Sequence, residues 1–417
     1  MIAPGIAPTM PYRLSLWLLI GSGVVAAAQI GKAIISVPMI RSEMGLGLDL
    51  AGVIVATFAT LGACAGIGAG VLVQRVGLRR SLIGGMCAIA IGNLIGAAAP
   101  SELALLVARI VEGVGFFSVV LAIPSLLARI VEEKNRDFVM AVWSAYMPAG
   151  IMLMLLVGPL LHAIGWRNLW IANAAVAGAC GVVLTRHAPH VREEQRESAE
   201  RFFGEAVRVA RNPWCLMLGF AFFAYSCQIF SLAFALPQLL TSAHGTTLGA
   251  AGLLSAAVLA VSTIGHVSSG FLLRAGLPIW ASIAVPFAFF AIASFAIYGG
   301  ALPPTGVALV AALALGAGGL APGALYASAP QAAPSPAAVP ATTIGLLQQA
   351  SNLGQFAGPV ALGVWVAHSG WYAAPTIVAP AALIGLAAAL AIRGVTDRSR
   401  TTPSAARELV HAQDARP

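Results

Sequence analysis

Three charged side chains lie inside long apolar segments of a sequence that otherwise keeps charge out of them. Lys32 interrupts the apolar residues 14–40, and Arg109 and Glu112 interrupt residues 102–128. In the middle of a membrane helix each charge costs about 2.5–3.5 kcal/mol unless it is paired or hydrated. A helix rises about 1.5 Å per residue, which places all three roughly 11–15 Å below one surface. Arg109 and Glu112, three residues apart, also share a helix face. We therefore expect the three residues to form one cluster.

Such a cluster could carry two kinds of chemistry. One carboxylate against two cations leaves a positive charge that would attract an anion. A dry site favours the protonated form of the Glu112 carboxyl and a neighbouring cation favours its charged form, so a change in hydration could move a proton. In the alternative interpretation Glu112 is a passive counter-ion, and the three residues form a structural cluster that holds two helices together.

The composition indicates that most of this chain faces lipid. Of its 417 residues 59% are hydrophobic and only 9% are charged, whereas about 25% of the residues of a soluble domain are charged. The net charge of +8 comes from basic residues between the apolar segments, so it indicates topology and not nucleic-acid binding. The five cysteines lie in apolar stretches without CxxC spacing, and we expect no disulfide framework, metal site or cofactor.

The apolar segments predict twelve membrane helices, six before and six after a polar linker. We therefore expect an all-α membrane protein, because open sheet edges are not tolerated in hydrocarbon. The predicted divisions are a cytoplasmic N-terminus at 1–13, an N-terminal six-helix bundle at 14–185, a cytoplasmic linker at 186–212, a C-terminal six-helix bundle at 213–393 and a cytoplasmic tail at 394–417.

Basic residues predict the orientation of the chain in the membrane. With the N-terminus inside, the outer loops contain only Arg41 and Arg167, and all the other inter-helix basic residues lie inside. This bias predicts a multi-pass protein of the inner, or plasma, membrane with both termini in the cytoplasm.

The two halves repeat at an offset of about 200 residues. The segment AQIGKAIISVP at 28–38 aligns with CQIFSLAFALP at 227–237, and both halves contain a Gly-Pro pair followed by a Gly-Trp pair. A fourth match is Gly70 before one basic loop and Gly270 before Arg274. Together the four matches indicate duplication of a six-helix unit, which is typical of transporters. Arg13 and the apolar segment after it imitate a signal peptide, but the repeat requires this segment, so we expect it to be retained.

The segment GVLVQRVGLRRSL at 70–82 resembles the signature loop between helices 2 and 3 of the major facilitator superfamily. Its matching positions, with glutamine where the family usually has aspartate, are Gly70, Gln74, Arg75, Gly77, Arg79 and Arg80. A second match, LLVARIVEGVG at 105–115, resembles the family's helix-4 pattern. The resemblance implies two pseudo-symmetric six-helix bundles, alternating access, a gating role for the loop, and a transporter and not an enzyme.

The family fold would place polar residues of both halves around a central cavity. As substrate-binding residues we predict Lys32, Arg109, Gln29, Tyr225, Gln228, Gln348, Asn352 and Gln355, with Glu112 as the proton-coupling residue. Our first hypothesis is a monomeric transporter that takes up a small organic anion, with proton symport and uniport both open. The alternative is a proton-driven exporter of drugs or metabolites. A membrane enzyme or a sensor on the same scaffold is a further class, but neither a catalytic constellation nor an appended soluble domain is evident.

Overall fold

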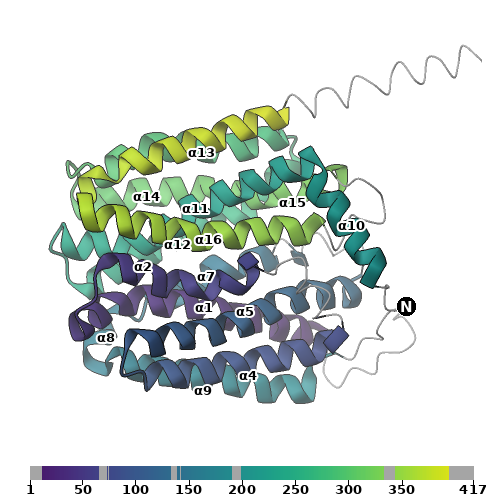
Figure 1. Ribbon diagram of the computed structural model, residues 1–417, viewed down its shortest axis with the longest axis horizontal. Helices are drawn as coiled ribbons and strands as arrows, with labels where there is room; N and C mark the ends of the chain where they lie inside the picture. The colour runs from purple at the N-terminus through teal and green to yellow at the C-terminus, as the bar shows by residue number, and fades with distance from the viewer. Residues whose placement is uncertain are drawn as a thin grey trace, which may run out of the picture.

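The computed structural model describes residues 12–64, 73, 75–132, 139–140, 142–189, 199–332 and 343–393. These residues are almost entirely helical, and no strand occurs among them. The long helices run side by side along the molecule, with the linker helix α10 (Ala199–Arg211) at one end and α8 at the other (Figure 1).

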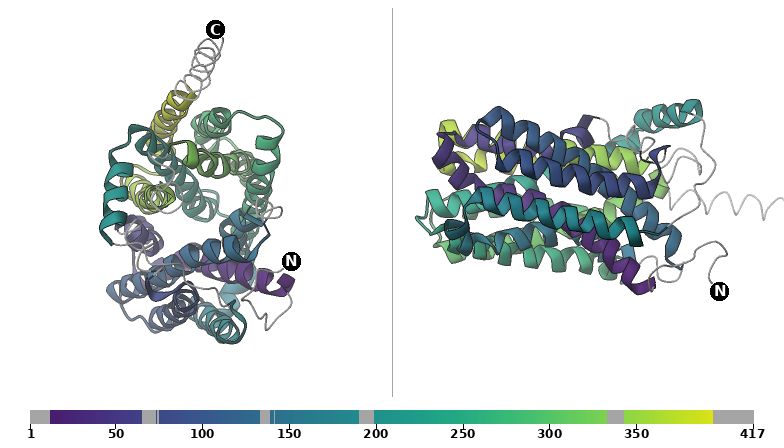
Figure 2. Two further views of the ribbon diagram at one scale, coloured as in Figure 1. Left: turned by 90° about the vertical axis from the view of Figure 1, so that its right-hand side faces the viewer. Right: turned by 90° about the horizontal axis from the view of Figure 1, so that it is seen from below.

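Each half of the chain contributes one set of helices. Those of the N-terminal half are α1 (Tyr12–Met44), α2 (Leu48–Ala56), η1 (Thr57–Ala59), α4 (Leu78–Ala97), α5 (Glu102–Ile130), α7 (Tyr146–Leu155), α8 (Gly158–Ile164) and α9 (Trp166–His187). Those of the C-terminal half are α11 (Pro213–Ser242), α12 (Leu248–Arg274), α13 (Ile279–Tyr298), α14 (Pro304–Gly318), α15 (Leu320–Ala332), α16 (Ile344–Ser369), η4 (Trp371–Ala373) and the helical remainder of the segment Trp371–Arg393. Seen along the helices, the two sets lie next to each other (Figure 2).

The helices account for all twelve predicted membrane segments. Within the described residues nine helices are long and apolar enough to cross a membrane, and a bent pair, Val142–Leu155 with Gly158–Ile164, provides a tenth. The shorter apolar helix Leu48–Cys64 and α16 fill the remaining two positions. The all-α class and the twelve-helix architecture are thus confirmed.

Proline explains the bend but does not impose one everywhere. The break of 50° between α7 and α8 lies at Gly158-Pro159, where the missing proline N–H removes a helical hydrogen bond. The second half has the matching pair Gly358-Pro359, yet α16 continues through it as one helix. The same dipeptide therefore interrupts a helix in one half and is accommodated in the other.

The repeat is visible in the turns that end the helices. Three pairs of glycines about 200 residues apart have nearly equal positive φ angles, a region that only glycine enters readily. The pairs are Gly45 (68°) with Gly245 (65°), Gly77 (95°) with Gly276 (96°), and Gly165 (75°) with Gly370 (77°).

A matching tryptophan follows the last of these glycines in each half. Trp166 Nε1 donates to Glu43 Oε2 at 2.6 Å, and Trp371 Nε1 donates to Ser242 Oγ at 2.9 Å. Both acceptors lie at the end of the first helix of their half. Each half thus joins its first helix to its last by the same kind of indole contact.

The two halves approach each other closely through glycines. Helix α2 packs against α16, and α12 packs against α7 and α8. A Cβ atom on Gly52 would lie 2.6 Å from the carbonyl oxygen of Pro359, and one on Gly252 would lie 2.7 Å from that of Leu155. Side chains larger than hydrogen at these positions would push the bundles apart.

Candidate functional site

Lys32, Arg109 and Glu112 come together as a fully buried ion-pair cluster. Lys32 Nζ pairs with Glu112 Oε1, and Arg109 Nη1 pairs with Glu112 Oε2. All three side chains are 0% exposed. The three residues thus lie together, as their depth and helix spacing indicated. The Glu112 carboxylate on α5 pairs with Lys32 on α1 and with Arg109 on its own helix.

Arg109 also binds the backbone of two neighbouring helices. Its Nη1 donates to the carbonyl oxygen of Gln29 at 3.0 Å, its Nε to that of Ile54 at 3.2 Å, and its Nη2 to that of Val55 at 3.4 Å. The planar guanidinium can serve all these acceptors at once because it carries five N–H donors. Arg109 therefore fixes α5 against both α1 and α2.

A second set of polar side chains surrounds Lys32. Asn93 Oδ1 accepts a hydrogen bond from Lys32 Nζ, and Asn93 Nδ2 donates to Gln29 Oε1 at 2.8 Å. Gln29 Nε2 continues to Asn173 Oδ1 at 3.3 Å. The Trp170 ring covers the ammonium, with its centroid 3.9 Å from Nζ. The network thus links α1, α4, α5 and α9.

Sequence reasoning did not single out Asn93, Asn173 or Trp170. The two asparagines are uncharged residues in apolar helices and are indistinguishable there from ordinary packing residues. Their one available signal is that a buried amide in a membrane helix needs a partner, which sequence alone does not identify.

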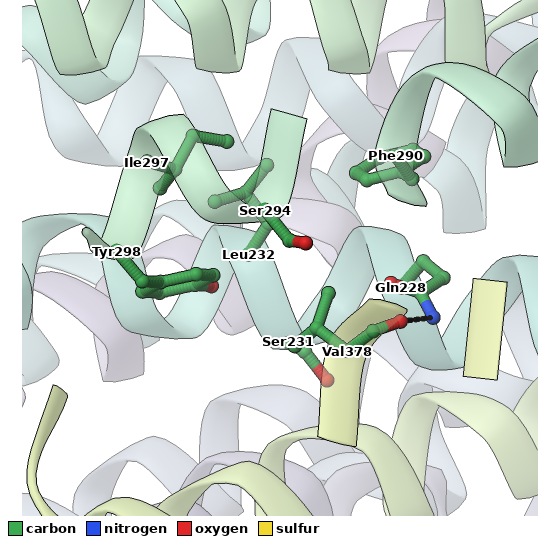
Figure 3. A pocket seen from close by; sticks show the side chains of 8 residues that line it. All are labelled: Gln228, Ser231, Leu232, Phe290, Ser294, Ile297, Tyr298 and Val378. Carbon is green, nitrogen blue, oxygen red and sulfur yellow. Dashed lines mark hydrogen bonds between the residues drawn. The ribbon is translucent and has the colours of Figure 1, made fainter. Parts of the chain in front are cut away.

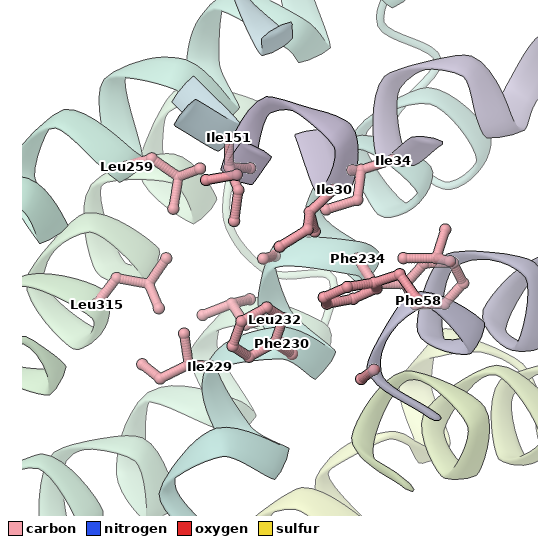
Figure 4. Packing of buried hydrophobic residues seen from close by; sticks show 14 of the residues in the cluster. Ile30, Ile34, Phe58, Ile151, Ile229, Phe230, Leu232, Phe234, Leu259 and Leu315 are labelled. Carbon is pink, nitrogen blue, oxygen red and sulfur yellow. The ribbon is translucent and has the colours of Figure 1, made fainter. Parts of the chain in front are cut away.

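The cluster faces the interior of the N-terminal half. Ile30 and Ile34, on the same helix as Lys32, belong to the hydrophobic cluster that both halves share (Figure 4). Lys32 lies two residues from each, which is about 200° around a helix. The ammonium therefore points away from that boundary, toward α4 and α9. That its surplus charge meets an anionic substrate stays a prediction, and it requires the cluster to open.

Part of the boundary between the halves is apolar. The buried apolar cluster in Figure 4 contains side chains of both halves, from α1, η1 and α7 and from α11, α12 and α14. The labelled members are Ile30, Ile34, Phe58, Ile151, Ile229, Phe230, Leu232, Phe234, Leu259 and Leu315. A solute that passes between the halves would first meet hydrocarbon and aromatic rings.

Gln228, predicted to bind substrate, lies inside the C-terminal half. Its Nε2 donates to the carbonyl oxygen of Val378 at 3.1 Å. Together with Ser231, Ser294 and Tyr298 it lines a cavity large enough for about one water molecule (Figure 3). The cavity is lined mainly by apolar atoms and is too small for an organic solute.

This cavity occupies the place that the charged cluster occupies in the other half. Gln228 aligns with Gln29, and three residues later Ser231 aligns with Lys32. Ser294 and Asn93 are both the sixteenth residue of their helices. Val378 and Asn173 each follow the equivalent tryptophan by seven residues. Serines thus replace the ammonium and one amide.

The other C-terminal candidates lie at or near α16. Tyr326 OH donates to Gln348 Oε1 at 2.7 Å, and Asn352 Nδ2 donates to the backbone oxygen of Gln348 at 2.8 Å. Gln355 Nε2 donates to Ser351 Oγ at 3.2 Å. Tyr225, on α11, is 4% exposed, and its ring centroid lies 6.1 Å from that of Phe222. These residues do not contact the charged cluster in any described interaction.

The predicted gating loop is only partly described. Gly70 and Gln74 lie outside the described residues. Gly77, with φ of 95°, caps the start of α4, where its N–H donates to the Val73 oxygen at 3.0 Å.

The described arginines of this loop connect elements of one half or face outward. Arg79 Nη2 donates to the backbone oxygen of Thr185 near the end of α9, whereas Arg75 and Arg80 are exposed. The gating role of the loop therefore stays a prediction.

Known transporters are similar to this chain in fold and in part of the sequence. A crystal structure of a bacterial homologue of the human lysosomal transporter Spinster, inward-facing and occupied, aligns with a TM-score of 0.69 and 19% identity. The alignment covers 94% of this chain and 98% of that one, and it shows a common fold.

Curated relatives match shorter stretches. The inner membrane transport protein YajR of Escherichia coli (strain K12) is 26% identical over 180 residues, 42% of this chain and 38% of that protein. The methylenomycin A resistance protein of Streptomyces coelicolor is 32% identical over 122 residues, 28% of this chain and 25% of that protein. A multidrug resistance protein B homologue of Mycobacterium tuberculosis is 35% identical over 117 residues, 28% of this chain and 22% of that protein. The matched stretches thus span about a fifth to two fifths of these relatives.

A sequence model of the Major Facilitator Superfamily matches residues 18–339, which is most of the chain and includes both the charged cluster and the first helices of the second half. With the twelve-helix fold and the transporter relatives, this match shows that the protein is a multi-pass membrane transporter, not an enzyme, and that it belongs to the major facilitator superfamily.

Proposed function

We propose that the protein is a proton-driven exporter of apolar small molecules. The observation that carries this proposal is the separation of charge from the boundary between the halves. Lys32, Arg109 and Glu112 are paired and fully buried within one half, whereas the described contacts between the halves are made by apolar side chains, glycines and neutral amides such as Asn352. An apolar solute loses little solvation free energy between such surfaces, whereas an anion loses much.

The relatives' names support the same direction. The methylenomycin A resistance protein and the multidrug resistance protein B homologue carry names of resistance proteins. Resistance by a membrane transporter implies outward movement of a compound. We therefore favour export over the uptake that the sequence first suggested.

We take residues 14–185 and 213–393 as the two moving bodies, with both termini in the cytoplasm and the protein acting as a monomer. The glycine contacts of α2 with α16 and of α12 with α7 and α8 would hold one side shut. Separation of the halves at these contacts, with closure at the end of the molecule that carries α10, would expose the solute to the opposite side of the membrane. A solute that binds more tightly while both sides are closed would lower the barrier between the two open conformations.

Glu112 is the proposed proton carrier. A proton on its carboxylate would leave Lys32 and Arg109 as two buried cations without a counter-charge, which is strongly unfavourable. Relief would require the arginine or the lysine to shift, or the lysine to release its own proton. Because Arg109 also holds the carbonyl oxygens of Ile54 and Val55 on α2, such a shift would reach the α2–α16 contact between the halves.

Uptake of a small organic anion is the second candidate, because the cluster has two cations and one carboxylate. The two candidates differ in which solute moves and in which direction.

Inside-out membrane vesicles test the proposal with Hoechst 33342, an aromatic dye that fluoresces in lipid. In energised vesicles the protein should lower dye fluorescence, and an uncoupler should abolish the effect. Glu112→Gln should also abolish it. Glu102→Gln, on the same helix but exposed, is the matched control and should retain it. Dye movement that survives in Glu112→Gln would refute the coupling role, and gradient-driven accumulation of benzoate without dye movement would favour the anion candidate.

A further inference from the structure

Two buried amide oxygens on α16 accept no hydrogen bond from the part of the protein that the structure describes. They are Asn352 Oδ1 and Gln355 Oε1, on residues that are 0% and 1% exposed. Burying an amide oxygen without a donor costs free energy comparable to a lost hydrogen bond. Native proteins seldom keep such atoms without a use for them.

The neighbouring contacts show that the free atoms are acceptors. Asn352 Nδ2 donates to the backbone oxygen of Gln348 at 2.8 Å. An exchange of its nitrogen and oxygen would place two oxygens against each other, so the orientation of this amide is fixed. Gln355 Nε2 donates to Ser351 Oγ at 3.2 Å. In these orientations both side chains present an oxygen without a donor, and each amide nitrogen keeps a second N–H beyond the hydrogen bond it donates.

Asn352 lies directly at the boundary between the halves. A Cβ atom on Gly62 would overlap its side-chain amide, and Gln349 Nε2 on the same helix donates to the Ala63 oxygen at 3.0 Å. Gly62 is one helical turn from Phe58, a member of the apolar boundary. The free oxygen is thus embedded beside the surface along which a solute would pass.

We propose that Asn352 Oδ1 and Gln355 Oε1 recognise a hydrogen-bond donor on the transported molecule, an inference that rests on the proposed function. The solute class is then an apolar, uncharged molecule that carries a hydroxyl, an amine or an amide N–H. A carboxylate is disfavoured because its charge would be buried beside α16 without a described cation to pair with it. When the bundles part, the donor would replace the missing protein partner.

Three naphthalenes that differ in one group test this inference. They are 2-naphthol, a donor; 2-methoxynaphthalene, of similar size without a donor; and 2-naphthoate, an anion. Binding is measured by their fluorescence on protein in nanodiscs, with empty nanodiscs subtracted. We expect 2-naphthol to bind about three- to tenfold more tightly than 2-methoxynaphthalene, as one hydrogen bond provides, and 2-naphthoate to bind most weakly.

The variants Asn352→Leu and Gln355→Leu should each reduce the preference for 2-naphthol over 2-methoxynaphthalene. Asn352→Leu should leave the unfolding temperature unchanged or raise it, because it removes a buried oxygen that has no hydrogen-bond donor. Gln238→Met is the matched control: Gln238 is a buried amide whose free atom is the Nε2 donor, and its replacement should not change the preference. Equal binding of 2-naphthol and 2-methoxynaphthalene, or a preference that persists in both leucine variants, overturns the inference and leaves the apolar function standing. Tightest binding of 2-naphthoate, or binding of none of the three, overturns the proposed function together with the inference.

Discussion

Replacing Glu112 by glutamine removes the carboxylate that both Lys32 and Arg109 contact. The variant keeps the shape of the side chain but leaves an ammonium and a guanidinium buried side by side. Loss of one partner of a buried ion pair typically costs about 3–5 kcal/mol. Arg109 keeps its backbone acceptors on α1 and α2, so Lys32 is the residue left with an uncompensated charge. We expect destabilisation in the upper part of this range.

Replacing Lys32 by methionine should be milder. The change removes the surplus cation, leaves the Glu112–Arg109 pair in place and fills most of the same volume. Its cost is the lost hydrogen bonds to Glu112 and Asn93, about 1–3 kcal/mol. The double variant Lys32→Met with Glu112→Gln should be more stable than Glu112→Gln alone, because only Arg109 then remains charged.

Thermal unfolding of the detergent-purified variants, followed by tryptophan fluorescence, ranks the three. The expected order of unfolding temperature is wild type, Lys32→Met, the double variant and Glu112→Gln. Glu102→Gln, an exposed carboxylate on the same helix, controls for loss of negative charge and should match the wild type. A Glu112→Gln variant as stable as Lys32→Met, or a double variant no better than Glu112→Gln, would show that charge balance does not govern this cluster.

Three further predictions follow from the packing. Gly252→Leu should hold the bundles apart where Leu155 approaches and raise maleimide labelling of a Leu155→Cys variant severalfold; unchanged labelling would contradict a tight contact there. Gly77→Ala should lower stability by about 1–2 kcal/mol because φ is 95°, which thermal unfolding measures against Gly84→Ala, a site with open space for a Cβ. Ser294→Asn should fill the one-water cavity beside Gln228 and raise the unfolding temperature, whereas a decrease would mean that the amide cannot be seated.

The fold was predictable because few backbone structures satisfy all their hydrogen bonds inside a lipid bilayer. Long apolar segments can only be helices in hydrocarbon, and the repeat of 28–38 in 227–237 reveals the duplication. The gathering of Lys32, Arg109 and Glu112 was predictable for a related reason. Three charges at one depth in apolar helices have few partners other than one another.

The direction in which the cluster faces was not predictable. Helix α1 carries a polar stripe that contains Gln29 and Lys32, and such a stripe could face either a central cavity or the interior of its own half. The choice depends on α4 and α9, which supply Asn93 and Trp170 as partners. No local property of α1 encodes those partners, so tertiary packing decided the outcome.

The comparison of the halves indicates where proton coupling can reside. The N-terminal half places Lys32 and Glu112 where the C-terminal half has Ser231 and, at the same distance from the helix N-cap, Ala314. The neutral residues at this place in the second half leave a water-sized cavity. A duplicated scaffold in which one copy holds all the buried charge among the described residues can respond to a proton in that copy alone. The other copy, with the free oxygen of Asn352 at the boundary, is then available for recognising the solute. Under the proposed function, coupling therefore requires the halves to move relative to each other, because the proton and the solute would be bound by different halves.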